Sequence, residues 1–169
     1  NLFMKYYTFY ISPVGKIMIA GDGDYITGLW IENQKHYAAG IDKNAQYSPN
    51  LNLFQCAGCW LDKYFSGVAM DNYDIPIRPT GSDFQRQVWQ ILRTVPYGRT
   101  ITYGTIANEL TKETGRSASP RAVGGAVGRN PISIIIPCHR VIGANKAMTG
   151  YAGGLDVKSK LLGRENIKL

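Results

Sequence analysis

The sequence has few residues of the kinds that build disulfide frameworks or metal sites, with three cysteines and two histidines in 169 residues. An odd number of cysteines without regular spacing fits a reducing cytoplasm better than a secreted fold. No apolar run approaches the roughly 20 residues of a membrane-spanning helix. The first residues have no long apolar core followed by a small-residue cleavage site, so they predict no signal peptide.

Acidic residues are scarce in the second half of the chain. Residues 1–79 carry 6 Lys/Arg and 7 Asp/Glu, net −1, whereas residues 80–169 carry 13 and 5, net +8. A basic half beside a neutral one indicates a polyanionic partner, although a solvated basic surface shows the same balance. The charge balance changes at a linker-like stretch, residues 77–81. We therefore predict two domains, 1–78 and 79–169.

The first domain is predicted to combine a small antiparallel sheet with one helix. Strands are expected at residues 6–11, 16–20 and 25–31, with a further short strand near 73–75. A short helix is expected near Tyr37 in an otherwise irregular segment. A longer helix, capped by Asn50 or Asn52, carries an apolar stripe that ends near Phe65.

Cys56 and Cys59 form a Cys-x-x-Cys pair in the middle of that longer helix. Structural zinc needs four ligands, and the remaining candidates, His36 and Cys138, are few. A redox pair would stand at a helix start that follows a strand. We therefore expect both cysteines to pack in the core, and we expect no metal site.

The second domain is predicted to be mainly helical. Helices are expected to begin at Ser82 or Asp83 and to cover residues 105–111, 120–129 and 155–164, with Leu155, Leu161 and Leu162 turned inward in the last. The helices at 105–111 and 120–129, joined by a short turn, form a helix-turn-helix candidate. Ser119 as a cap and Pro120 at the first position suit the start of the second of these.

The helix over residues 120–129 contains Gly124, Gly125 and Gly128. Each glycine costs about 1 kcal/mol of helix stability relative to alanine. Such small side chains allow the backbone to approach either another helix or a nucleic acid. With Arg121 and Arg129 near its ends, we favour the nucleic acid, and the narrow minor groove suits a helix with so little side-chain bulk.

Cys138 stands between the apolar run Ile134–Pro137 and the pair His139-Arg140. The β-branched run predicts extended, buried backbone, and Pro137 ends it. An isolated cysteine is usually a small buried hydrophobe. An imidazole and a cation beside it, however, are the surroundings that lower a thiol pKa. We therefore predict that Cys138 is a nucleophile.

These motifs together resemble the methylated-DNA–protein-cysteine methyltransferases, also called 6-O-alkylguanine-DNA alkyltransferases. The resemblance is carried by Ile136-Pro137-Cys138-His139-Arg140-Val141, Val88-Trp89, Pro96-Tyr97-Gly98-Arg99-Thr100, Tyr103-Gly104, Arg121-Ala122-Val123-Gly124-Gly125-Ala126, Asn130-Pro131 and Thr149-Gly150-Tyr151-Ala152-Gly153-Gly154. It covers nearly all of residues 80–169. Residues 1–79 share only general features with the family, namely a small α/β domain of variable sequence that ends in a helix. It implies an α/β, ribonuclease-H-like N-terminal domain and a mainly α, winged-helix-like C-terminal domain with the helix-turn-helix.

The resemblance also implies irreversible, stoichiometric DNA repair. Cys138 would take a methyl or alkyl group from the 6-oxygen of guanine, or the 4-oxygen of thymine, after the nucleotide is flipped out of the duplex. His139 would accept the thiol proton through a water, and Glu165 would orient the imidazole. Asn130 would hold the turn before the active-site segment. Tyr103 would help rotate the nucleotide and could protonate the departing guanine.

The partner implied is double-stranded DNA with an alkylated guanine, bound through its minor groove by a monomer, with no membrane, cofactor or metal involved. The DNA contacts implied are Arg121, which would enter the base stack, and Ala122, Gly124, Gly125, Thr102 and Arg129. The base pocket implied consists of Val127, Val141, Tyr151 and Ala152. Thr102 stands where a serine is common in the family, which could alter a phosphate contact. The location expected is the cytoplasm, or the nucleus in a eukaryote.

Three alternatives remain at this point. Alkyltransferase-like proteins bind alkyl lesions without catalysis, but they have tryptophan where this chain has Cys138. A transcriptional regulator would need a second DNA-binding domain, for which we expect no room in these 169 residues. A cysteine hydrolase could use Cys138, His139 and Glu165, although adjacent Cys and His would be unusual there, and repeated turnover would reveal it.

Overall fold

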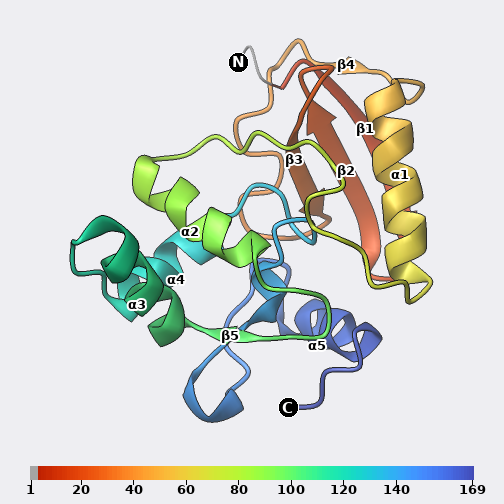
Figure 1. Cartoon of the computed structure of the whole chain (residues 1–169). Coiled ribbons are helices and arrows are strands. Elements are labelled where there is room, and N and C mark those ends of the chain that lie inside the picture. The colour runs from red at the N-terminus through yellow and green to blue at the C-terminus, as the bar shows by residue number, and fades with distance from the viewer. Residues whose placement is uncertain (1–3) are drawn as a thin grey trace.

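The computed structural model describes residues 4–169, in which a small sheet with one helix precedes a mainly helical half (Figure 1). The first half contains β1 (Tyr6–Ser12), β2 (Gly15–Gly21), β3 (Ile26–Ile31), β4 (Gln46–Tyr47) and α1 (Asn52–Phe65). The second half contains α2 (Asp83–Arg93), β5 (Ile101–Thr102), α3 (Tyr103–Thr114), α4 (Pro120–Gly128), the 3₁₀ turn η1 (Cys138–Arg140), β6 (Val141–Ile142), the 3₁₀ turn η2 (Ala144–Lys146) and α5 (Leu155–Arg164). This order confirms the predicted fold class. Asn1–Phe3, part of the start that predicts no signal peptide, lies outside the described residues.

The sheet is mixed rather than purely antiparallel. β1, β2 and β3 form the predicted antiparallel meander. β4, which the sequence did not predict, pairs with β1 in parallel, so the strand order is β3-β2-β1-β4. A parallel pair needs a long crossover, and the chain from the end of β3 to Gln46 supplies it. Across residues 4–169, no helix is long and apolar enough to cross a membrane.

The predictions of two short elements in the first half, a helix near Tyr37 and a strand near residues 73–75, are wrong. The segment around Tyr37 forms turns instead of a helix, because His36 and Ala38 have positive φ angles of 59° and 55°, which a right-handed helix excludes. Residues 73–75 form a turn and a bend rather than a strand. The extended pairing occurs slightly later, where Ile77 makes a parallel bridge with Ile26 of β3.

α1 covers one face of the sheet because its apolar side chains recur three and four residues apart. Its buried residues are Leu53, Phe54, Ala57, Trp60, Leu61 and Tyr64. The cap position is Leu51, which offers no side-chain hydrogen bond, so neither Asn50 nor Asn52 has the predicted role.

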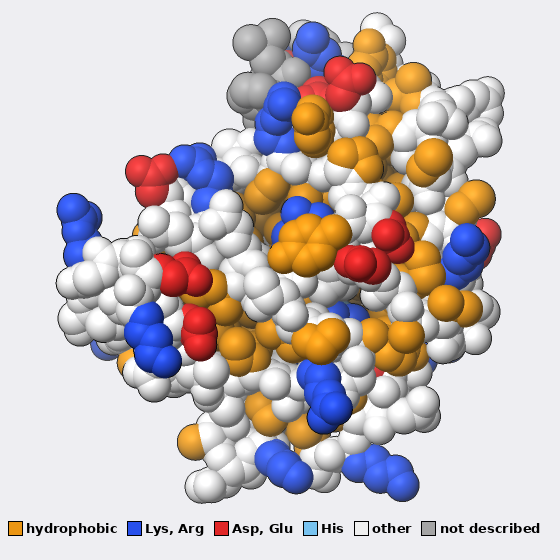
Figure 2. Space-filling model, in the orientation of Figure 1, with side chains coloured by type: hydrophobic (Ala, Val, Ile, Leu, Met, Phe, Trp, Pro, Cys, Tyr) orange, Lys and Arg blue, Asp and Glu red, His pale blue; other side chains and the backbone are white. Residues whose placement is uncertain are grey.

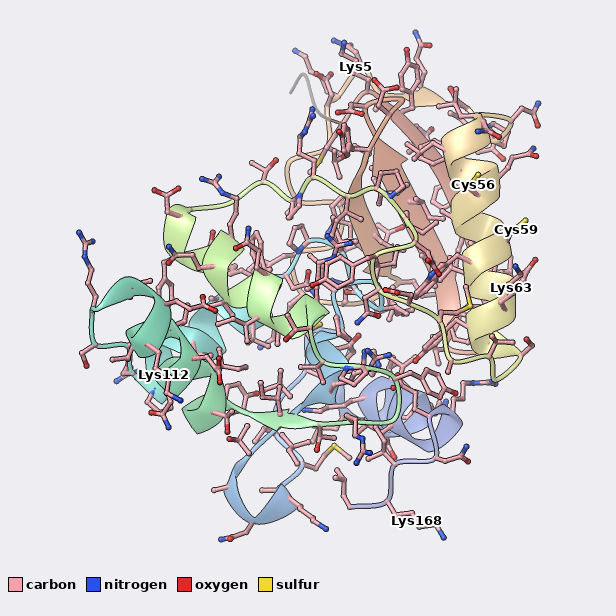
Figure 3. The ribbon with its side chains drawn as sticks, in the orientation of Figure 1. Lys5, Cys56, Cys59, Lys63, Lys112 and Lys168 are labelled. Atoms are coloured by element: carbon pink, nitrogen blue, oxygen red, sulfur yellow. The ribbon has the colours of Figure 1, made fainter. Side chains whose placement is uncertain are left out.

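The prediction that Cys56 and Cys59 pack in the core is also wrong. Both lie exposed on α1 (Figure 3). At about 100° per residue they stand roughly 100° and 160° from the centre of the buried stripe. Their position on the helix, rather than the apolar character of cysteine, therefore determines that both side chains face the solvent.

The helices of the second half begin where capping chemistry allows. Ser82 and Gln85 form a capping box at the start of α2, and Ser119 caps α4 with Pro120 at its first position, as predicted. α3 begins at Tyr103, two residues earlier than predicted, because the Thr102 hydroxyl accepts a hydrogen bond from the Thr105 N–H at 3.1 Å. The assignment of α3 and α4 as a DNA-binding helix-turn-helix remains a prediction.

α5 has the predicted bounds but a different buried face. Leu161 and Leu162 point into the core as expected, whereas Leu155 is 50% exposed. A buried lysine, Lys158, takes the inward position in the first turns of this helix.

The isoleucine run before Cys138 is buried as predicted but not extended. Ile134 has φ +71°, a left-handed conformation that β-branched residues rarely adopt. The Ile136 N–H donates to the Ile132 carbonyl at 3.0 Å and closes a tight turn. Ile132 itself forms a parallel bridge with Leu29 of β3. Tertiary pairing with the first half therefore overrides the β-propensity of the run and determines where Cys138 lies.

One hydrophobic cluster runs through both halves, from the sheet and α1 to α2, α3, α4 and the turn before Cys138. Trp89 of α2 joins this core with a hydrogen bond from its indole N–H to the Ala126 carbonyl at 2.9 Å. On the face shown in Figure 2, Lys and Arg side chains stand beside Asp and Glu over α2 and α3, so the basic excess forms no single patch there. The boundary between residues 78 and 79 stays a prediction.

Two glycine-to-alanine substitutions are expected to have opposite effects on stability. In β3, a Cβ on Gly28 would lie 2.6 Å from two ring carbons of the buried Trp30, so Gly28→Ala should lose about 1–3 kcal/mol of unfolding free energy. In α1, a Cβ on Gly58 would meet nothing within 4 Å, so Gly58→Ala should gain up to about 1 kcal/mol. Urea unfolding of both variants measures the two effects, and equal signs would contradict this packing.

Candidate active site

Cys138 lies in the wall of a cavity of about 290 Å³ between the second-half helices and the loop before α5. The cavity is lined by Lys35, Tyr103, Gly124, Val127, Gly128, Cys138, Gly150, Tyr151 and Ala152. The cysteine is 4% exposed. Its thiol is therefore reached only by a group that enters this cavity.

Asn130 ties the end of α4 to the segment that carries Cys138. Its side-chain amide donates to the Ile136 carbonyl at 2.8 Å, and its side-chain oxygen accepts from the Ile132 N–H at 2.9 Å. Both bonds are buried, where hydrogen bonds are hardest to replace with water. The asparagine therefore holds the turn in which the sequence analysis placed it.

Glu165 follows α5 and presents a buried carboxylate to four donors. Its Oε1 accepts from the Arg140 Nε–H at 2.8 Å and the Gly98 N–H at 3.0 Å. Its Oε2 lies 2.5 Å from His139 Nε2 and accepts from the Tyr64 hydroxyl at 2.8 Å. Burial opposes ionisation, but the His139 hydrogen bond, the charges of His139 and Arg140 and the Gly98 N–H together lower the pKa of Glu165 to about 2.

The carboxylate of Glu165 decides which nitrogen of His139 carries the proton. An ionised carboxylate only accepts hydrogen bonds, so Nε2 must carry the hydrogen that points at it. Burial lowers the pKa of His139, and the hydrogen bond to Glu165 opposes that shift. The neutral ring therefore has a lone pair on Nδ1, and among residues 4–169 this buried nitrogen has no hydrogen-bond partner. The arrangement makes Nδ1 a proton acceptor.

Burial also raises the pKa of the Cys138 thiol, and the Asn130 side chain, the Lys158 charge and Tyr151 act in the opposite direction. This corrects one expectation from the sequence. Arg140, expected to serve the thiol as a cation, instead donates to Glu165 and to the Val95 carbonyl.

Lys158 supplies a positive charge that acts on the Cys138 thiol. Its ammonium is buried and donates to the Val141 carbonyl at 2.6 Å and to the carbonyl and hydroxyl of Thr149 at 3.1 and 3.3 Å. Burial lowers the pKa of Lys158 to about 8, while the charge of Cys138 acts to raise it. Thr149 also contacts the Tyr103 hydroxyl at 3.0 Å. Lys158 therefore links Val141 of β6 to the loop that carries Thr149 and, through Thr149, to Tyr103.

The structure brings most of the predicted pocket residues together. Tyr103, Val127, Tyr151 and Ala152 line the cavity with Cys138. Val141 is outside the lining, because it is fully buried and its carbonyl binds Lys158.

The predicted DNA contacts lie mainly on the outer side of α4. Arg121, Ala122, Gly125 and Arg129 are exposed, whereas Gly124 sits against the Tyr103 ring and lines the cavity. Thr102 uses its hydroxyl to cap α3. The contacts of all six residues with DNA stay predictions.

Three residues of the site were not found from the sequence. The sequence pattern indicated Tyr64 only as one more inward residue of an amphipathic helix, and it gave no signal that Lys158 is buried. Lys35 gave no signal, since it reaches the cavity from the first half, where its N–H donates to the Ala152 carbonyl at 3.0 Å. Over residues 4–169, no group of three or more His, Cys, Asp or Glu side chains is arranged to hold a metal ion.

Comparison with known proteins agrees with this geometry. A family model described as the ribonuclease-like domain of 6-O-methylguanine DNA methyltransferase matches residues 5–79, and one described as its DNA-binding domain matches residues 83–167. A methylated-DNA–protein-cysteine methyltransferase of Haemophilus influenzae is 42% identical, over 96% of this chain and 87% of the relative. One of Methanosarcina acetivorans is 44% identical, over 93% and 96%.

A solved structure of Mycobacterium tuberculosis OGT in complex with DNA matches with a TM-score of 0.82 at 39% identity, over 95% of this chain and 92% of that chain. The fold thus defines a class of protein, one with a ribonuclease-like domain followed by a mainly helical DNA-binding domain. Within that class, the chain belongs to the 6-O-methylguanine DNA methyltransferase family, which confirms the resemblance of its motifs.

Glu165→Gln should destabilise the protein in a pH-dependent way. The folded-state pKa of about 2 lies below the ordinary 4.5, so the carboxylate stabilises the fold above about pH 4.5 and loses this effect as the pH falls toward 2. We expect a loss of about 3 kcal/mol at pH 7 and a smaller difference from wild type at pH 3.5. Urea unfolding at both pH values measures it.

Asp156→Asn is the matched control, because Asp156 pairs with Lys160 on the surface. An exposed ion pair of this kind contributes about 0–1 kcal/mol. A loss for Glu165→Gln that is equal at both pH values would contradict the role of the charge.

Proposed function

We propose that this protein repairs alkylated DNA directly, by transferring a methyl or alkyl group from the 6-oxygen of guanine to Cys138. The observation that carries this proposal is one buried thiol in the wall of a cavity, followed by a histidine whose only free ring nitrogen is an acceptor. A cavity of about 290 Å³ is at the lower end of the roughly 300–1,000 Å³ of small-molecule pockets, which suits a single nucleobase.

The transfer begins with loss of the thiol proton. His139 Nδ1 accepts the proton of Cys138 through a water, and the nearby ionised Glu165 stabilises the resulting imidazolium. Lys158 stabilises the thiolate that forms. Both charges are created inside the protein, where an opposite charge stabilises them more than it would in water.

The thiolate then attacks the alkyl carbon. A sulfur–carbon bond forms as the bond between that carbon and the 6-oxygen breaks, and the electron pair of the broken bond goes to the departing guanine. Tyr103, which lines the cavity, would donate a proton to that guanine. The product is a thioether, which has no thiol left to react, so each molecule acts once.

Access to the base requires that the nucleotide leaves the duplex, because the 6-oxygen of guanine faces the major groove and the thiol lies in a cavity that only an extruded base can enter. α4 is suited to lie in the minor groove, since a Cβ on Gly125 or Gly128 would meet nothing within 4 Å. Arg121, exposed in the first turn of α4, would fill the gap that the flipped nucleotide leaves. The geometry needs one protein molecule per lesion, which is the basis for proposing a monomer.

The same arrangement would accept the 4-oxygen of thymine, which presents the same alkyl ether to the thiolate. A free nucleophilic cysteine needs a reducing compartment, so we propose a cytoplasmic location, or a nuclear one in a eukaryote. No feature of the site favours the alternative of a lesion-binding protein without catalysis, because Cys138 is present with its proton acceptor.

The number of transfers is expected to be limited to one per molecule. Incubation with a duplex that carries one labelled 6-O-methylguanine should label wild-type protein to a plateau of one methyl group, at any excess of DNA. Cys138→Ala should accept none while still binding the duplex. Release of free methanol with repeated turnover would instead indicate a hydrolase, and binding without transfer by wild type would indicate a lesion-binding protein.

Arg121→Ala should reduce base flipping more than DNA binding. Removing one positive charge from a protein surface that contacts DNA phosphates weakens binding only modestly. Loss of the residue that fills the gap in the base stack should instead slow transfer by about 10- to 100-fold, as expected for a few kcal/mol of unstacking energy. A fluorescent base opposite the lesion reports flipping. Lys43→Ala, the same charge change at an exposed site of the first half, is the control and should leave flipping unchanged.

A further inference from the structure

We propose that Tyr64, on α1 of the first half, is a positioning residue for alkyl transfer, because its hydroxyl holds the carboxylate that orients His139. The inference rests on the proposed function, since it assigns a role in that reaction to a residue outside the DNA-binding half. Tyr64 is not among the residues that line the cavity. It acts through Glu165.

The Tyr64 hydroxyl contacts both His139, the proton acceptor, and Glu165, which orients it. It donates to Glu165 Oε2 at 2.8 Å, the same oxygen that lies 2.5 Å from His139 Nε2. It also lies 3.4 Å from His139 Nε2 itself. The three groups form one buried cluster, in which two donors share one carboxylate oxygen.

Neighbouring aromatic rings pack around Tyr64 and fix the direction in which its hydroxyl points. Tyr64 is 1% exposed. It stacks on Trp60 at 5.7 Å between ring centroids, and it meets Phe65 and Tyr97 edge-on at 5.1 and 6.1 Å. Such packing fixes the rotamer, which is what a positioning residue requires. Burial, followed by the charge of Glu165, keeps the pKa of Tyr64 far above its ordinary range, so the group stays a donor.

The end of α1 is fastened to the same place by a second contact. The Arg164 guanidinium donates to the Phe65 carbonyl at 2.9 Å, and Arg164 directly precedes Glu165. The first half therefore supplies a side-chain donor and a backbone acceptor to the chain around the carboxylate. This dependence gives α1 a use in the reaction beyond covering the sheet.

Removal of the hydroxyl has a predictable electrostatic sign. The O–H of Tyr64 partly offsets the negative charge on Glu165 Oε2. Without it, the carboxylate stabilises the protonated ring of His139 more strongly, so the pKa of His139 rises. The other charged or titratable groups that face His139 are Arg140 and Cys138 on η1 and Lys158 on α5, while Tyr97 faces Tyr64 and Glu165. All of these remain unchanged in Tyr64→Phe.

Tyr64→Phe keeps the ring and removes only the hydroxyl. We expect its rate constant for transfer from 6-O-methylguanine duplex to fall about tenfold at pH 8, and to fall further at pH 6, because more of His139 is protonated there. Tyr10→Phe is the matched control, since Tyr10 also donates to a carboxylate, Asp62 at 2.6 Å, and neither residue lines the cavity. It should stay within about twofold of wild type at both pH values.

A readout independent of activity tests the same idea. The chain has two histidines, of which His36 is exposed and serves as an internal reference. NMR titration should show the pKa of His139 raised in Tyr64→Phe relative to wild type. A variant that transfers at the wild-type rate, or that loses the same factor at every pH with an unshifted His139, overturns the proposal. If wild type itself transfers nothing, the proposed function fails, whatever the titration shows.

Discussion

The structure depends most on the buried carboxylate of Glu165. A buried charge destabilises a fold unless it is fully hydrogen-bonded, and this one is satisfied by donors from three separate parts of the chain. Tyr64 comes from α1, Gly98 from the loop before β5, and His139 and Arg140 from η1. No two of these parts are adjacent in sequence. The hydrogen bonds to this one carboxylate therefore hold the first half in a fixed position relative to the second. The same hydrogen bonds leave His139 with one free nitrogen.

A second constraint places the reactive thiol next to the surface that we propose contacts DNA. Asn130 joins the end of α4 to the segment of Cys138 through two buried hydrogen bonds, so the position of the thiol depends on that of the helix. Gly124 and Gly128 of α4 line the cavity, while the exposed Arg121 and Gly125 belong to its outer side. In the proposed complex, the α4 helix would be the wall between the duplex and the cavity, and its small residues would keep that wall thin. A flipped base would travel about one helix width.

Local signals made much of this fold predictable. Period-2 and period-3.6 patterns, the Ser82 and Ser119 caps and the Pro120 start place the three main strands and the helices. What failed depends on tertiary contacts: β4 is too short to show a pattern, Ile134 is forced into a left-handed turn by pairing with β3, and the buried Lys158 has its acceptors in a distant loop. Cys138 and His139 were recognisable because their chemistry is unusual side by side. Tyr64 was not, because an inward tyrosine on a helix usually means only packing.

The central claim is that a neighbouring proton acceptor, rather than exposure to solvent, makes Cys138 the thiol that reacts. The chain offers its own comparison, because Cys56 and Cys59 are exposed and Cys138 is buried. The most direct test is peptide mapping by mass spectrometry after reaction with a duplex that carries 6-O-methylguanine. A single methyl group on the peptide of Cys138, with Cys56 and Cys59 unmodified, is the predicted result. A methyl group on either exposed cysteine, or an unmodified Cys138, would contradict the account.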